Sequence, residues 1–385
     1  MTAPGSDRLV AGPRVAGARP GRRRLARALL VGVSSSVVLL VVSLATAPGW
    51  RPPLALPPLD VAPHPAVEPV DRHLPYAAVD RTTTTTASGA GARVVRPRGA
   101  EGTIPGVVLV AGSGTTTRDD LADEAEALAR GGLAVLTYDK RRAGSSVLRP
   151  DYGRLADDAL AALDAVARQP GVDPERVGLL GFSEGGWVVP LAAQRAPGRV
   201  AFTVLLSAPV VSPLDQAAWT LDRRLAAAPL RVRAALGTGL AMGRPLLGHL
   251  GTDVRPALAA APQPTCAAWG AEDPTVPVRV AVGRFRAATG ERGRAEVVGG
   301  AGHRVPVASG WAERVSDWVR RGYPADAVVR GAQPVAPEGL PTPPGTGFRT
   351  DPRPQLALTA LAALVAGLWP LTRPTPRRIR TSRRG

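Results

Sequence analysis

The chain has 385 residues, a formal net charge of +17, 45% hydrophobic residues and a single cysteine. The length is sufficient for one sizeable core with flanking segments, and one cysteine excludes an internal disulfide. A basic chain suggests nucleic acid as a partner, but much of this charge lies at the two ends beside apolar runs and without a nucleic-acid-binding motif, so we expect no nucleic-acid partner.

The N-terminal end combines a basic arm with an apolar run. Residues 1–27 hold seven arginines and one acid, and residues 28–47 carry no charge and are rich in Leu and Val. A run of this length matches the hydrocarbon thickness of a bilayer and exceeds the ~7–15 residues of a signal-peptide core. We predict a transmembrane helix that acts as an uncleaved signal anchor; a signal peptide cleaved after residues 45–47 is the alternative.

A Pro-rich segment, residues 48–80, is predicted to be a semi-rigid linker. From 81 to 322, apolar strand-like runs alternate with helical patterns, which predicts one α/β domain with a mostly parallel sheet covered by helices on both faces. Five consecutive threonines at 82–86 are predicted to form a first edge strand. The further predicted strands are 106–110, 133–138, 177–182, 201–207, 265–269 and 295–298, and the helices are 121–130, 155–168 and 310–321.

The segment Gly181-Phe182-Ser183-Glu184-Gly185 is a Gly-x-Ser-x-Gly motif between an apolar run and a helix-compatible stretch. A nucleophilic serine at such a site lies on a tight strand-to-helix turn, which needs small residues two positions away on each side. The motif in this context predicts that Ser183 is a nucleophile, with Gly181 and Gly185 as the glycines of the turn. A structural turn with an idle serine is the alternative.

A nucleophilic serine needs a base, and the chain has four histidines. His64 and His73 lie in the Pro-rich stretch, and His249 lies in an insertion described below. His303 follows the predicted strand 295–298 in a Gly-rich loop, so we predict that His303 is the base.

The base in turn needs an acid that orients it. The predicted strand 265–269 continues into an acidic loop that contains Glu272 and Asp273. Asp273 is the better candidate because Pro274 and Pro277 restrict the loop around it, and Glu272 is the alternative.

Further segments resemble the α/β-hydrolase superfamily. Residues 107–114 look like the strand and oxyanion loop of these enzymes, and residues 138–146 resemble the segment after the next strand. The order Ser183, Asp273, His303 is the order expected of that fold. Over roughly residues 82–321, the chain is similar to bacterial hydrolases of the serine aminopeptidase and acyl-thioesterase-like branch.

The resemblance implies the α/β-hydrolase fold and an oxyanion hole made by the backbone N–H groups of Ser113 and Glu184. It requires no cofactor and no metal. The family usually has a histidine before the oxyanion glycine, where this chain has Ala111. That histidine usually orders the oxyanion loop and takes no part in the chemistry. The alanine at this position therefore bears on the geometry of the loop and not on the reaction.

An insertion at residues 208–262 separates two predicted strands. It is too long for a structureless loop, and helical patterns at 214–227 and 230–250 predict a helical cap over the serine. Arginines in the cap are compatible with an anionic substrate, but Lys140 is the only lysine in the sequence. The excess of arginine therefore indicates a GC-rich coding bias instead. The cap arginines are Arg223, Arg224, Arg231, Arg233 and Arg244.

The C-terminal end repeats the pattern of the N-terminal end. A Pro-rich linker at 323–354 precedes an uncharged apolar run at 356–371 and a basic tail at 372–385. We predict a second transmembrane helix at 356–371. The positive-inside rule then places both termini in the cytoplasm and the hydrolase domain outside, at the cell membrane.

The predicted location outside the cytoplasm limits the possible substrates, because coenzyme A thioesters are cytosolic. We therefore expect a small-molecule ester or peptide as substrate, with carboxylic ester hydrolysis first and peptidase activity of the serine aminopeptidase type second. A non-catalytic, membrane-tethered binding protein on the same fold is the alternative from another class.

Overall fold

The computed structural model describes residues 20–46, 54–63, 74–142, 149–326, 328–336, 338–342, 348 and 351–368. The described residues fall into two units, one within 1–47 and 346–385 and the other within 48–345. Residues 1–19 of the basic arm and the predicted basic tail at 372–385 lie outside the described residues, as do His64 and His73.

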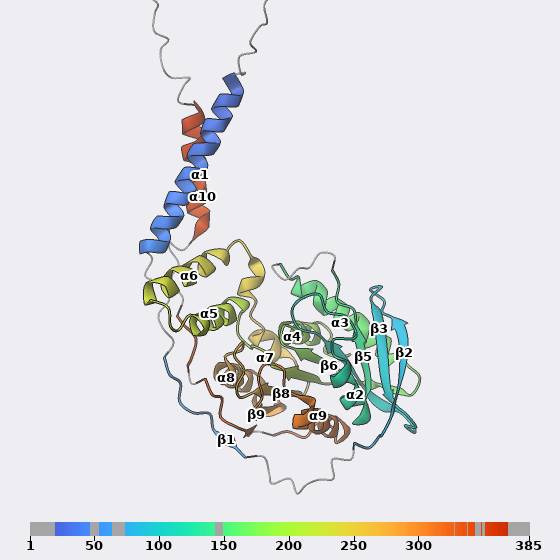
Figure 1. Ribbon diagram of the computed structural model, residues 1–385. Helices are drawn as coiled ribbons and strands as arrows, with labels where there is room; N and C mark the ends of the chain where they lie inside the picture. The colour runs from blue at the N-terminus through green and yellow to red at the C-terminus, as the bar shows by residue number, and fades with distance from the viewer. Residues whose placement is uncertain are drawn as a thin grey trace, which may run out of the picture. The chain divides into compact units, whose positions relative to one another are not determined.

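The larger unit is built on a ten-stranded sheet in the order β1-β10-β9-β8-β7-β6-β4-β5-β3-β2 (Figure 1). Neighbouring strands are parallel except where β3 pairs with β2 and with β5. The strands are β1 Val61–Ala62, β2 Val79–Thr85, β3 Gly91–Pro97, β4 Ile104–Val110, β5 Ala134–Tyr138, β6 Val172–Phe182, β7 Thr203–Leu206, β8 Thr265–Gly270, β9 Gly293–Val298 and β10 Val329–Gly331.

Helices cover both faces of this sheet. Val108 and Leu179 belong to a core shared with α3, α4, α7 and α8, whereas their chain neighbours Val107 and Leu180 belong to a core shared with α2 and α9. Side chains alternate between the faces of a strand, so these are the two sides of the sheet. The helices are α2 Ala122–Arg130, α3 Tyr152–Ala167, α4 Gly185–Arg195, α5 Pro213–Arg224, α6 Leu230–Gly243, α7 Arg255–Ala260, α8 Val278–Thr289 and α9 Trp311–Arg320, with 3-10 turns η1 Gly248–Gly251, η2 Gly290–Arg292 and η3 Val307–Ser309.

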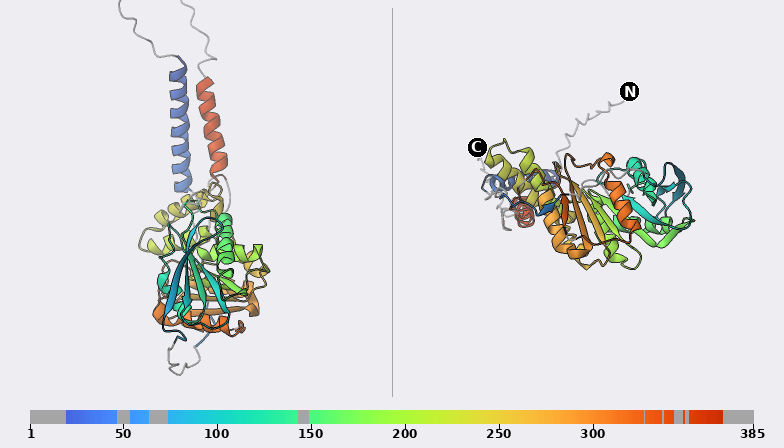
Figure 2. Two further views of the ribbon diagram at one scale, coloured as in Figure 1. Left: turned by 90° about the vertical axis from the view of Figure 1, so that its right-hand side faces the viewer. Right: turned by 90° about the horizontal axis from the view of Figure 1, so that it is seen from below.

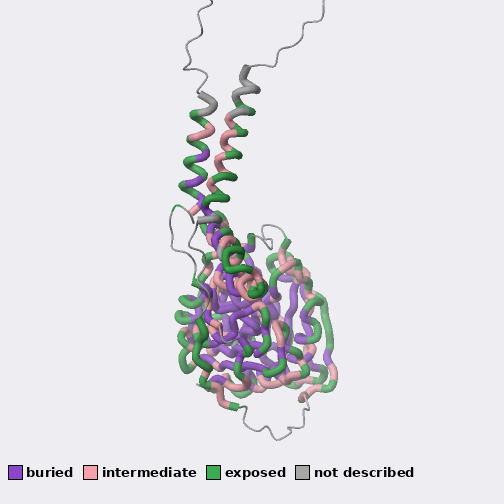
Figure 3. Tube along the Cα trace, turned by 60° about the vertical axis from the view of Figure 1, so that its left-hand side comes forward, coloured by how far each residue is buried: buried purple, intermediate pink, exposed green. Residues whose placement is uncertain are grey.

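Burial explains why the strand predictions succeeded. Every residue of β4, β5, β7 and β8 is buried, as expected for parallel strands that are covered on both sides. Buried residues fill the middle of this unit (Figure 3). The threonine-rich strand β2 lies at the edge of the sheet and is mostly exposed, which confirms the predicted edge strand. The predicted α/β architecture with a mostly parallel sheet is confirmed.

The Pro-rich segments differ from the prediction. Residues 48–80 and 323–354 were expected to be spacers outside the fold, yet they supply β1 and β10, which pair with each other and extend the sheet beyond β9. Proline is tolerated near the ends of such short peripheral strands because few ladder hydrogen bonds are lost there. Strand β3 and helices α7 and α8 were not predicted from the sequence.

The smaller unit is a pair of helices, α1 Pro20–Thr46 and α10 Pro352–Leu368, which lie side by side (Figure 2). Gln355 Nε2 donates to Ser43 Oγ at 2.9 Å, and a Cβ placed on Gly32 would lie 3.2 Å from the Cβ of Ala363. The start of α10 therefore contacts the end of α1, so the two helices are antiparallel.

The predicted transmembrane helices at 28–47 and 356–371 receive no support. Among the described residues, no helix combines the length and the apolar character needed to cross a membrane. Residues 47 and 369–371 of the two predicted spans lie outside the described part of the chain.

Candidate active site

Three predicted site residues meet at one edge of the sheet. Ser183 follows β6, Asp273 lies in the loop after β8, and His303 lies in the loop after β9. These strands are parallel, so their carboxyl ends share one edge, which is where open α/β sheets place ligands. Because β5 and β6 lie on opposite sides of β4, the strand order reverses next to Ser183.

The three side chains form a continuous hydrogen-bonded series. His303 Nε2 lies 2.9 Å from Ser183 Oγ, and His303 Nδ1 lies 2.8 Å from Asp273 Oδ2. The other carboxylate oxygen of Asp273 accepts from the backbone N–H groups of Thr275 and Val276 at 2.7 and 3.0 Å. Asp273, whose side chain is fully buried, is thereby fixed in orientation. This geometry fits an imidazole that carries its proton on Nδ1 and accepts the hydroxyl proton at Nε2.

The turn that carries Ser183 leaves no room for larger residues. Ser183 has a φ of 52°, in the left-handed region that non-glycine residues rarely adopt. A Cβ placed on Gly181 would lie 2.4 Å from the carbonyl oxygen of Gly185, and one placed on Gly185 would lie 2.5 Å from that of Val110. The close backbone approach explains why both positions hold glycine.

The structure distinguishes the two candidate acids. Asp273 contacts His303, whereas the Glu272 side chain is exposed and its backbone N–H donates to the Ala301 carbonyl at 2.9 Å. A Cβ on Gly270 would lie 2.1 Å from the carbonyl oxygen of Gly302, so the acid loop and the histidine loop are in backbone contact. The structure therefore brings Asp273, and not Glu272, to the imidazole.

Two groups that the sequence analysis did not identify hold the histidine loop. The Ser207 hydroxyl donates to the His303 carbonyl at 2.6 Å, and Ser207 is fully buried with a φ of 49°. Arg304 binds the buried carboxylate of Glu124 with two nitrogens, at 2.8 and 2.9 Å. The adjacency of Arg304 to His303 was the only sequence signal, because both contacts join segments that are far apart in the chain.

The predicted oxyanion donors flank the serine. The Gly112 backbone lies against Ser183, because a Cβ on Gly112 would be 3.5 Å from the Ser183 Cβ. Glu184 is the residue before helix α4, where the helix dipole favours negative charge. Within the described part of the chain, the N–H groups of Ser113 and Glu184 have no hydrogen-bond partner. Neither N–H group is therefore engaged by another of these residues.

The insertion between β7 and β8 contains α5, α6, η1 and α7, so the predicted cap is helical. Helix α5 contacts the acid loop, because Gln216 and Thr220 both donate to the Thr275 carbonyl, at 3.3 and 3.0 Å. Arg223 pairs with Glu338 at 3.0 Å, and Arg233 pairs with Asp222. These two cap arginines are engaged within the protein, which weakens their case as substrate ligands.

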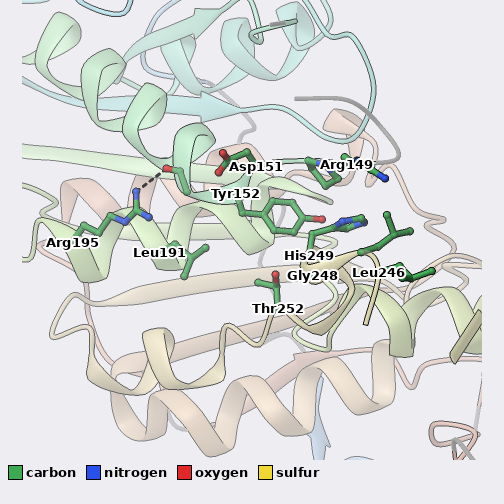
Figure 4. A pocket seen from close by; sticks show the side chains of 12 residues that line it. Arg149, Asp151, Tyr152, Leu191, Arg195, Leu246, Gly248, His249 and Thr252 are labelled. Atoms are coloured by element: carbon green, nitrogen blue, oxygen red, sulfur yellow. Dashed lines mark hydrogen bonds between the residues drawn. The ribbon is translucent and has the colours of Figure 1, made fainter. Parts of the chain in front are cut away.

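A cavity of about 550 Å³ lies between the cap and helices α3 and α4 (Figure 4). His249 lies in its wall beside Tyr152, with ring centroids 6.4 Å apart, and burial lowers the pKa of His249. Neither Ser183 nor His303 lines this cavity. His249 is therefore a cap residue and is not the partner of the serine, in agreement with the choice of His303.

Comparison with known proteins supports the class that this geometry indicates. A family model described as serine aminopeptidase, S33, matches residues 105–244, which include Ser113 and Ser183 but end before Asp273 and His303. Together with the sheet topology and the three hydrogen-bonded side chains, this match supports a member of the α/β-hydrolase superfamily. The family match and the fold support a hydrolase of the serine type.

Among individual proteins, the chain is similar to two uncharacterized proteins of Mycobacterium tuberculosis, from strains CDC 1551 / Oshkosh and ATCC 25618 / H37Rv. Each is 34% identical over 200 residues, or 52% of this chain. The chain spans 63% of the length of these relatives.

Solved structures with a similar fold include the α/β hydrolase GrgF from Penicillium sp. sh18, with 19% identity and a TM-score of 0.46 over 64% of this chain and 99% of that one. The 2,6-dihydroxy-pseudo-oxynicotine hydrolase has 19% identity and a TM-score of 0.48 over 66% of this chain and 71% of that one. At these identities and TM-scores the likeness is one of fold and does not extend to activity.

Proposed function

We propose that this protein hydrolyses carboxylic esters through an acyl-enzyme on Ser183. The observation that carries the proposal is the unbroken series from the Ser183 hydroxyl through His303 to the buried carboxylate of Asp273, with both distances below 3 Å. A nucleophile, a base and a group that orients the base are the three parts that serine hydrolysis requires.

The proposed reaction has an acylation and a deacylation half-reaction, and His303 acts as base and then as acid in each. His303 Nε2 accepts the Ser183 proton as Oγ attacks the ester carbonyl carbon, and Asp273 stabilises the imidazolium that forms. The N–H groups of Ser113 and Glu184 bind the oxyanion of the tetrahedral intermediate. The imidazolium protonates the departing alkoxide, which leaves as an alcohol. A water molecule then gives its proton to His303, attacks the acyl carbon and releases the carboxylic acid with regeneration of Ser183.

The peptidase alternative is favoured by the description of the matching family model, a serine aminopeptidase. An aminopeptidase must bind the positively charged α-ammonium of its substrate, for which a carboxylate is the fitting partner. The two buried carboxylates beside Ser183 are both engaged, Asp273 by His303 and Glu184 by Lys140. This favours a neutral ester over a free amino terminus.

A fluorophosphonate probe tests the proposal directly. The wild type should be labelled on Ser183 and the Ser183→Ala variant should not. A panel of nitrophenyl esters of different chain length, assayed beside aminoacyl nitroanilides, then separates esterase from aminopeptidase. A folded wild type that is neither labelled nor active on any member of the panel would instead support the non-catalytic binding protein.

We also propose, from the sequence, that the protein resides at the cell membrane with the hydrolase domain outside the cytoplasm. The support is the uncharged run at 28–47 between a basic arm and the domain, and the basic tail at the other end. Alkaline phosphatase is active only when exported, so a fusion after residue 75 should be active and a fusion after residue 385 inactive. Recovery of the full chain in the soluble fraction after carbonate extraction would refute this location.

A further inference from the structure

Lys140, the only lysine in the sequence, lies two residues beyond the end of β5 and contacts both segments of the predicted oxyanion hole. Its ammonium Nζ donates to the Gly112 carbonyl oxygen at 3.0 Å and forms an ion pair with the Glu184 carboxylate. The side chains of Lys140 and Glu184 are only 12% and 6% exposed. The pair is therefore buried, and it lies where three strands end.

The contact with Gly112 bears on the first oxyanion donor. The Gly112 carbonyl and the Ser113 N–H belong to the same peptide unit, which is planar and trans, so they point in opposite directions. A bond that holds the carbonyl oxygen therefore fixes the direction of the Ser113 N–H. The neighbouring Ala111 side chain has no donor that could hold this loop.

The contact with Glu184 bears on the second donor. The backbone N–H of Glu184 is the second proposed donor, while the Glu184 side chain forms an ion pair with Lys140. One ammonium group thus joins the two residues whose N–H groups must converge on one oxygen atom. A hydrogen bond from a cation also polarises the Gly112–Ser113 peptide, which makes its N–H a stronger donor.

We propose that Lys140 is a positioning residue of the oxyanion hole, which aligns and polarises the Ser113 donor and ties it to Glu184. This inference rests on the proposed function, because an oxyanion forms only if Ser183 attacks a carbonyl. Lys140 itself touches no reacting atom. Its effect should therefore appear in the transition state and be absent from substrate binding.

The neighbouring residue offers a matched control. Arg141 forms an ion pair with Asp158, whose side chain is only 4% exposed, so this pair is also partly buried and starts from the same loop. Within the described residues, the Arg141 side chain forms its hydrogen bonds and ion pair with Asp158 and none with Gly112, Ser113 or Glu184. Loss of Arg141 reproduces the damage of breaking a buried pair without disturbing the oxyanion loop.

The experiment compares Lys140→Met, the double variant Lys140→Met/Glu184→Gln, and Arg141→Met. The double variant removes the unpaired buried carboxylate that would otherwise destabilise the fold. Steady-state kinetics on the best nitrophenyl ester give kcat and KM separately. The affinity for an alkylboronic acid, which becomes tetrahedral on the serine and places an oxygen in the oxyanion hole, reports on that hole directly.

Both Lys140 variants should lose kcat by about tenfold to a hundredfold, because complete loss of one oxyanion donor costs about 10²–10³. KM should stay within about twofold, and affinity for the boronic acid should fall by the same factor as kcat. Arg141→Met should lower the melting temperature and leave kcat and boronic acid affinity near wild type.

Three outcomes separate the possibilities. A folded double variant with wild-type kcat and boronic acid affinity overturns the positioning role. Equal losses of kcat in Lys140→Met and Arg141→Met also overturn it, because the effect would then be general to the loop. If the wild type is not labelled by fluorophosphonate, the proposed hydrolase function itself is wrong. This result is obtained before any Lys140 variant is measured, so it is distinguished from failure of the positioning role.

Discussion

The turn that carries Ser183 and the helical cap lie in the same domain but are built in opposite ways. At the turn, added Cβ atoms on Gly181, Gly185 and Gly186 would each lie within 2.5 Å of neighbouring atoms, and helix α4 is buried over most of its length. In the cap, helix α5 buries Leu214, Ala218 and Trp219, whereas helix α6 buries few of its described residues. Several large apolar side chains of the cap are exposed, namely Leu230, Val232, Leu236 and Leu246.

The difference indicates a division of labour. Close backbone contacts hold the Ser183 nucleophile in a single position. This suits a reaction that depends on distances of about 3 Å between reacting groups. Helix α6 leaves large apolar side chains exposed, so this part of the cap should tolerate substitution, which suits the selection of substrates. Changes at the turn should therefore act on turnover or folding, whereas changes in the cap should act on substrate affinity.

The largest effect is expected from Ser183→Ala. The substitution removes the nucleophile but adds no atoms to the crowded turn, so the fold should remain. Turnover of the best ester should fall by a factor of about 10⁶, as is typical for loss of a nucleophile. Activity above a tenth of the wild-type rate would mean that another residue is the nucleophile.

Next in size are the base and the acid. His303→Ala should be nearly as damaging as Ser183→Ala, and Asp273→Asn should lower kcat by about 10⁴ because the amide favours the wrong imidazole tautomer. Glu272→Gln is the matched control, and it should behave like the wild type because the Glu272 side chain is exposed. A severe loss in Glu272→Gln with a mild one in Asp273→Asn would move the acid by one position.

A third prediction tests the rigidity of the turn itself. In Gly185→Ala the new Cβ would meet the Val110 carbonyl oxygen at 2.5 Å, so the turn must shift. We expect destabilisation of about 1–3 kcal/mol, together with a loss of kcat. The control is Gly283→Ala in helix α8, where a Cβ meets no atom within 4 Å and should stabilise the helix by about 1 kcal/mol. Thermal unfolding monitored by circular dichroism measures both, and equal melting temperatures would contradict a rigid turn.

The smallest effect is expected in the cap. His249→Ala should change KM for long-chain esters by about two- to fivefold and leave kcat unchanged, since loss of a few apolar contacts in a pocket is worth about 1 kcal/mol. Burial lowers the pKa of His249 below its ordinary value of 6.5, so the imidazole is mostly uncharged at any pH above 6.5. The change in KM should therefore be the same at pH 7 and at pH 8. A drop in kcat would contradict the division of labour between turn and cap.

The sequence by itself determined the parts of this protein that depend on local patterns. Continuous apolar runs predicted the central strands, because a parallel sheet covered on both faces buries every residue. The glycines around Ser183 predicted the turn, because only small residues fit there. His303 followed by elimination from four histidines, and the two prolines after Asp273 favoured it over Glu272.

Only the tertiary structure decided the contacts between distant segments. Ser207 binds the carbonyl of a histidine 96 residues away, and Lys140 joins loops that lie 28 and 44 residues from it. The strands β1 and β10 form because two Pro-rich segments from opposite ends of the domain meet beside β9. No local pattern encodes such meetings, because the strand order brings these residues together only after the sheet has formed.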